Sequence, residues 1–101
     1  MNHKMVFRKE VEDDLVLAYH WYEKKSIGLG EEFLRMFYAS LAEVEKYPLA
    51  WRKVYREFRR CLLRRFPYAI YYIAEKNEIL VYGVIHGARN TVFTESLLDN
   101  R

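Results

Sequence analysis

The stretch that decides the fold is residues 58–85, which read FRRCLLRRFPYAIYYIAEKNEILVYGVI. It is rich in β-branched, aromatic and aliphatic residues, and such residues favour strands. Two groups of turn-forming residues interrupt it, Phe66-Pro67 and Glu75-Lys76-Asn77. We therefore predict a meander of three strands. These strands cover residues 58–66, 68–74 and 78–85.

Before this stretch the spacing of apolar residues becomes helical. From Glu10 onward apolar residues recur three and four positions apart, and between Glu31 and Tyr47 the same spacing gives one buried face. The segment Ser26–Gly30 separates the two helices, and Pro48 ends the second. The pattern predicts a helical hairpin.

The two ends of the chain add one element each. Residues 4–8 read as a short strand, and residues 91–100 fit either a short terminal helix or a docked strand. The order β-α-α-β-β-β predicts an α+β fold, with the helices on one face of a mainly antiparallel sheet. Because the chain has 101 residues, we expect a single domain over residues 1–101.

Composition excludes several classes of protein. Hydrophobic residues are 51% and charged residues 31% of the chain, which excludes a disordered protein. No apolar run reaches the roughly 18 residues that span a bilayer, and we expect neither a signal peptide nor membrane contact. The single cysteine, Cys61, has no internal partner, so we expect a buried structural thiol and a cytoplasmic location. His3, His20 and His86 are too scattered for a metal signature, and no Gly-rich phosphate loop exists, so we expect no metal and no cofactor.

Positive charge is concentrated in residues 48–65, which hold seven bases against Glu57 alone, and six of these bases are arginine. Two interpretations are open: a solvated face that balances the acidic residues 10–47, or a site for an anionic partner. Arginines fall on both alternating faces of the predicted strand 58–66. Because an unpaired buried guanidinium is costly, at least one row must lie on an open sheet face or an edge. The arginines concerned are Arg59, Arg60, Arg64 and Arg65.

The last strand closes with His86-Gly87-Ala88-Arg89. A histidine and an arginine at a strand end suit acid–base chemistry or anion binding, and they equally suit a capping histidine and a surface arginine.

The chain carries an ordered set of short motifs. They are Asp14-Leu15, Trp21-Tyr22-Glu23, Gly28-Leu29-Gly30-Glu31-Glu32-Phe33, Tyr47-Pro48, Arg59-Arg60, Arg65-Phe66-Pro67-Tyr68-x-Ile70-x-Tyr72 and Val84-x-His86-x-x-Arg89. This set, over residues 5–93, resembles the RelE/ParE superfamily of small toxins from type II toxin–antitoxin, or plasmid-stabilisation, systems. The resemblance implies the β-α-α-β-β-β fold, growth inhibition as the activity, and a hetero-oligomer with a cognate antitoxin.

The superfamily divides by target, and two departures favour its ParE-like branch, whose members block DNA gyrase. RelE-like members cut messenger RNA on the ribosome and typically carry an arginine where this chain has Ala69. The C-terminal tyrosine of some of those nucleases corresponds here to Phe93, which has no proton to give. The competing hypothesis is a ribosome-dependent endoribonuclease that uses Arg65, His86 and Arg89 on messenger RNA. A third is a degenerate, non-toxic member that only binds its antitoxin.

The same resemblance directs attention to partner-binding residues. Trp21 lies off the apolar stripe of the first helix, so it is the better candidate for an antitoxin contact, together with the exposed side of the helical hairpin. Tyr22 lies on the stripe and is expected to pack inside. The arginines expected to bind the target or an acidic antitoxin, with the last converging on the others, are Arg59, Arg60, Arg64, Arg65 and Arg89.

Overall fold

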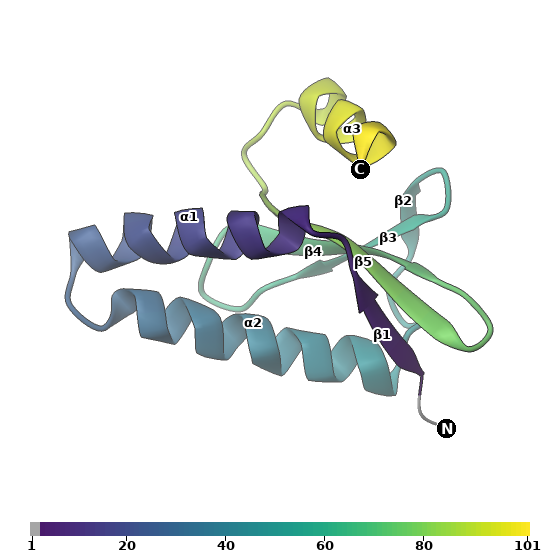
Figure 1. The fold of residues 1–101 in the computed structure, drawn as a ribbon, viewed down its shortest axis with the longest axis horizontal. Coiled ribbons are helices and arrows are strands. Elements are labelled where there is room, and N and C mark those ends of the chain that lie inside the picture. The colour runs from purple at the N-terminus through teal and green to yellow at the C-terminus, as the bar shows by residue number, and fades with distance from the viewer. Residues whose placement is uncertain (1–2) are drawn as a thin grey trace.

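A computed structural model describes residues 3–101 of the chain and shows three helices and a mixed sheet (Figure 1). The elements are β1 (Lys4–Phe7), α1 (Glu10–Lys25), α2 (Leu29–Lys46), β2 (Lys53–Tyr55), β3 (Phe58–Leu62), β4 (Tyr68–Ala74), β5 (Glu78–His86) and α3 (Thr91–Asn100). The predicted α+β fold is confirmed. The C-terminal segment adopts the helical one of its two predicted alternatives.

The strand order in the sheet is β1-β5-β4-β3-β2. β1 runs parallel to β5, and the other neighbours are antiparallel. The short β1 pairs only with the first half of β5, from Lys4 opposite Glu78 to Phe7 opposite Val81. The second half of β5 therefore has a strand neighbour on one side only.

The joint between α1 and α2 is built around one carboxylate. Glu23 in α1 accepts hydrogen bonds from the backbone amides of Gly28 and Gly30, both at 2.9 Å, and so caps the N-terminus of α2. Gly28 has φ of +90°, which glycine adopts without strain, and a Cβ on Gly30 would lie 2.8 Å from Cδ2 of Tyr19. Because of this cap, α2 begins at Leu29, two residues before the predicted Glu31.

The helical hairpin covers one face of the sheet and forms the larger core with it. Phe33 is fully buried at its centre, where its ring contacts Phe66 and Tyr68 with centroids 5.3 and 5.1 Å away. Tyr72 is also fully buried, and its hydroxyl donates to the Pro48 carbonyl at 2.6 Å. Burial raises the pKa of Tyr72 to about 12.

The opposite face is covered by α3, which lies across the sheet from α2 (Figure 1). Leu98 of α3 packs among Phe58, Ala69, Tyr71 and Ile85. The predicted one-sided cover is confirmed for the helical hairpin, and the terminal helix, whose position was not predicted, lies on the other face. The reason is that these sheet residues give the second face an apolar patch of its own, which needs a cover.

The arginine-rich strand is shorter than predicted. β3 ends at Leu62, and residues 63–67 form a loop, because Arg65 takes a left-handed conformation with φ of 69° and Pro67 follows it. The sequence also missed β2, a three-residue strand whose pairing with β3 is irregular. Over residues 3–101, the helices are too short or too polar to cross a membrane.

Candidate partner-binding grooves

The unpaired half of β5 is partly closed by side chains. Beyond the end of β1, the Val84 amide donates to Oδ2 of Asp14 at 3.0 Å, and the Tyr82 carbonyl accepts from Nη1 of Arg101 at 3.2 Å. The two side chains also form a bidentate ion pair, at 2.6 and 2.9 Å, with 14% and 11% of their surfaces exposed. Asp14 from α1 and Arg101 after α3 thus meet at the sheet edge.

Past this ion pair the edge of β5 is open and lies at the bottom of a groove of about 230 Å³. We name it the edge groove. Leu17 and Ala18 of α1 form one wall, Phe93 and Leu97 of α3 form the other, and residues 84–86 of β5 form the floor. Leu17 is 73% exposed, so its apolar surface faces the groove and solvent.

Polar groups gather at one end of the edge groove. The His86 ring packs edge-on against Tyr68, and its Nδ1 accepts from the Ala88 amide at 2.9 Å. The Arg89 guanidinium lies 4.7 Å from the Phe93 ring centre, over its face. Burial raises the pKa of the Tyr68 hydroxyl, and the positive charge of Arg89 opposes the shift. Of the residues that the structure describes, none places a carboxylate within ion-pair distance of Arg89.

A second groove follows the exposed side of the helical hairpin, on the other flank of α1. We name it the hairpin groove. Its two sections, of about 500 and 350 Å³, share Glu12, Leu15 and Tyr38. Its apolar lining residues include Phe7, Leu15, Val16, Leu34, Tyr38 and Leu41.

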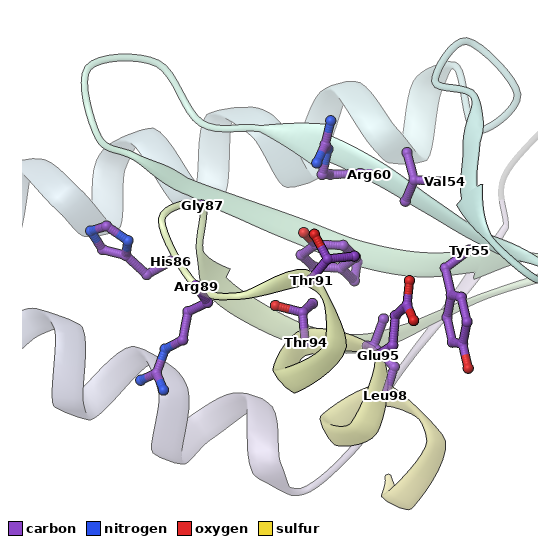
Figure 2. A pocket seen from close by; sticks show the side chains of 11 residues that line it. Val54, Tyr55, Arg60, His86, Gly87, Arg89, Thr91, Thr94, Glu95 and Leu98 are labelled. Atoms are coloured by element: carbon purple, nitrogen blue, oxygen red, sulfur yellow. The ribbon is translucent and has the colours of Figure 1, made fainter.

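A small cavity of about 100 Å³ lies between α3 and the sheet. Figure 2 shows Arg60 and Arg89 on opposite sides of it, with guanidinium groups that point away from each other. His86 also points away from the cavity in this view. The cavity therefore does not collect the positive charges into one anion site.

The structure separates the arginines that the sequence grouped. Arg59 faces the helices, where its Nη1 donates to the Trp51 carbonyl at 2.6 Å, and Arg60 is exposed on the opposite face. Arg64 and Arg65 lie in the loop after β3, and Arg65 forms an ion pair with Glu32 of α2. Because Arg59 and Arg60 lie on opposite faces of the sheet, the predicted arginines do not all form one patch.

The other residues that the sequence singled out include one exposed aromatic residue and two residues in the core. Trp21 is 57% exposed, one helical turn after Leu17 on the wall of the edge groove, and Nζ of Lys25 lies 4.3 Å from its ring centre. Tyr22 packs inside against Phe33 as expected. Cys61 is buried and its pKa is raised to about 11, mainly by burial. The described residues contain no group of three side chains that could hold a metal ion.

Sequence reasoning missed Leu17, Asp14 and Arg101 as parts of a site. One feature of the sequence could have identified Leu17: like Trp21, it is apolar but lies off the buried stripe of α1. The partnership of Asp14 with Arg101 joins residues 87 positions apart, and no local pattern marks it.

Comparisons with known proteins agree with this fold. The family profile described as "ParE toxin of type II toxin-antitoxin system, parDE" matches residues 5–91. The chain therefore belongs to the ParE toxin family of type II toxin–antitoxin systems. A solved structure described as the chromosomal ParDE toxin–antitoxin system from P. aeruginosa superposes with a TM-score of 0.70 at 16% sequence identity. The superposition covers 83% of this chain and 95% of that one, and it shows a shared fold. No curated protein matches the sequence.

Proposed function

We propose that this protein is a ParE-like toxin that inhibits DNA gyrase and is held inactive by a cognate antitoxin, a helix of which lies in the hairpin groove. The observation that carries the proposal is the hairpin groove itself, which exposes apolar side chains of β1, α1 and α2. Tyr38 is 59% exposed, Val16 47% and Phe7 45%. Solvent-exposed apolar surface of this extent marks a site for a protein partner.

The shape of the groove favours a helical occupant. It is bordered by two antiparallel helices, and an amphipathic helix lays its apolar face into such a groove through residues spaced three and four apart. Charged residues such as Glu12 and Glu31 border it, and Arg8 and Lys9 lie at one end. The groove therefore offers an apolar centre with a polar border, which is the usual anatomy of a protein interface.

The arrangement of Arg65, His86 and Arg89 supports a toxin that acts by contact rather than by cutting RNA. Cleavage of RNA needs groups that activate the 2′-hydroxyl and protonate the leaving oxygen at one place. Arg65 is engaged with Glu32, and no hydrogen bond or shared cavity within residues 3–101 joins it to His86 or Arg89. His86 Nδ1 is engaged with the Ala88 amide.

Purified toxin and purified gyrase test the target directly. We expect the toxin to block supercoiling of a relaxed plasmid, and we expect induced expression to stall replication while full-length messages persist. Ribosome-dependent cuts in messenger RNA, with normal supercoiling, would instead establish the endoribonuclease alternative. Normal supercoiling, intact messages and normal growth would identify a non-toxic member.

A further inference from the structure

β2 and β3 form a short two-stranded ribbon at the edge of the sheet opposite β1. We name residues 52–60 the basic ribbon. It holds one acid, Glu57, and five bases, Arg52, Lys53, Arg56, Arg59 and Arg60. Glu57 pairs with Lys53 at 2.8 Å, and Asp99 of α3 pairs with Arg56 at 3.4 Å. Counting both carboxylates against the five bases leaves a net charge of +3 at this edge.

The pairing of the two strands brings like charges together. Lys53 lies directly opposite Arg59 in the antiparallel register of β2 and β3. The same register, continued by one position, brings Arg52 opposite Arg60, and both are exposed. Like charges directly opposite each other destabilise a strand pair. Within residues 3–101, neither Arg52 nor Arg60 has a carboxylate within ion-pair distance, so a bound anion would relieve the repulsion.

The turn of the basic ribbon is strained by the residue that it contains. Only Arg56 and Glu57 connect β2 to β3, and Arg56 has φ of 51°. Glycine, asparagine and aspartate are the usual residues of such a turn, because positive φ is unfavourable for a side chain such as that of arginine. Backbone strain of this kind is concentrated at functional sites. The side chain of Arg56 is 67% exposed, so the turn holds a positive charge outward.

The shape of the basic ribbon fits the major groove of a DNA duplex, which is about 12 Å wide and admits a two-stranded β-ribbon. Figure 1 shows the turn between β2 and β3 at the rim of the molecule, clear of α1 and α2. The bases occupy both faces and the tip, since Arg59 faces the helices, Arg60 lies on the opposite face and Arg56 is in the turn. Phosphates flank the groove on both sides, whereas a flat anionic surface would meet one face only.

We propose that the basic ribbon binds the phosphate backbone of duplex DNA, namely the duplex that DNA gyrase holds when the toxin inhibits it. The inference rests on the proposed function and adds the DNA of the gyrase complex to the toxin's target. The hairpin groove does not compete for this site, because its lining residues come from the segment 7–9, α1 and α2. Contacts to phosphates give affinity that depends strongly on salt and carries little sequence preference.

DNA contact is tested first without gyrase, by fluorescence anisotropy of a labelled duplex of about 20 base pairs with the purified full-length toxin. We expect the logarithm of the binding constant to fall with the logarithm of the salt concentration, with a slope of about −2 to −4, because each neutralised phosphate contributes about −0.9. No binding at low salt, or a slope near zero, overturns the inference. Tighter binding to single-stranded RNA of the same length overturns it as well. Inhibition of supercoiling by the same preparation would leave the proposed function intact in either case.

Charge reversal locates the contact on the protein. We expect the double variant Arg52→Glu, Arg60→Glu to bind the duplex at least tenfold more weakly, with a slope shallower by about 2. The control is Lys24→Glu, Lys25→Glu in the last turn of α1, which makes the same change in net charge away from the ribbon and should lose less than threefold. Equal losses in the two double variants overturn the inference. If the reversed ribbon does not fold, the neutral pair Arg52→Gln, Arg60→Gln decides by the same comparison.

Inhibition of gyrase connects the DNA contact with the toxin's activity. We expect the variant Arg52→Glu, Arg60→Glu to need at least tenfold more protein for half-inhibition of plasmid supercoiling, whereas the control variant inhibits as the wild type does. Full inhibition by a ribbon variant that no longer binds DNA overturns the inference and leaves the proposed function intact. Failure of the wild-type toxin to inhibit gyrase overturns the proposed function, and with it the gyrase-held duplex as the partner of the ribbon.

Discussion

The two faces of the sheet are covered in different ways. On one face, two long helices bury a continuous core in which Phe33, Phe66 and Tyr68 are in mutual contact. On the other face, the single helix α3 buries Thr94 and Leu98, and polar pairs that involve Asp99 and Arg101 hold its C-terminal end. The first face has the packing that stabilises the domain. The second face is covered by less of the chain, and α3 on it forms one wall of the edge groove.

The largest expected effect comes from the well-packed face. Phe33→Ala removes a fully buried ring from the centre of the larger core, so we expect the free energy of unfolding to fall by about 3–5 kcal/mol. Leu98→Ala on the opposite face should cost less, about 2–3 kcal/mol, because α3 can shift to fill the space. Urea unfolding of both variants measures the difference. An equal or larger loss for Leu98→Ala would show that α3 is as much a part of the core as the hairpin.

The next largest effect is expected for the ion pair of Asp14 and Arg101, which joins α1 to the residue after α3. Asp14→Ala leaves both the Arg101 guanidinium and the Val84 amide without their partner in a mostly buried place, so we expect a loss of about 2–4 kcal/mol. Amide exchange should rise first in α3 and at Val84, since these depend on the pair. The neighbouring Asp13 is exposed and serves as the control, with an expected change of Asp13→Ala within about 0.5 kcal/mol. Uniformly raised amide exchange over the whole chain would show that the ion pair does not stabilise α3 and Val84 in particular.

These differences also explain which parts of the fold could be predicted from the sequence. The spacing of apolar residues alone is enough to predict the helical hairpin, because Phe33 and Phe37 repeat at helical spacing on one buried face. The sequence pattern is also enough to predict β4 and β5, whose residues are mostly buried on both sides of the sheet. The end of β3 could not be predicted, since it depends on a left-handed backbone at Arg65, a residue that rarely adopts one.

The candidate site was predicted only in part, for a related reason. His86 and Arg89, which line the edge groove, and Trp21, which is exposed, were singled out because unusual residue types at element ends and off apolar stripes are visible in the sequence. That these residues bind a partner stays a prediction. The edge groove itself arises because β1 is shorter than β5 and because α3 crosses to the other face. Both facts depend on tertiary packing between residues far apart in the chain.

The smallest expected effect comes from the loop after β3, where Arg64 and Arg65 are both exposed but differ in backbone conformation. Arg65 has φ of 69° and Arg64 has no positive φ. A left-handed conformation costs a residue with a Cβ about 1–2 kcal/mol, and glycine avoids that cost. We therefore expect Arg65→Gly to be more stable than Arg65→Ala by about 1 kcal/mol.

The reverse order is expected one residue earlier. At Arg64, glycine gains nothing in the folded state and loses more entropy on folding, so Arg64→Gly should be less stable than Arg64→Ala by about 0.5 kcal/mol. The ion pair of Arg65 with Glu32 affects neither comparison, because both variants at position 65 lack the guanidinium, and an exposed pair contributes only about 0–1 kcal/mol. Thermal unfolding of the four variants measures both orders. The same order at both positions would place Arg65 in an ordinary backbone conformation and would remove the physical reason for the early end of β3.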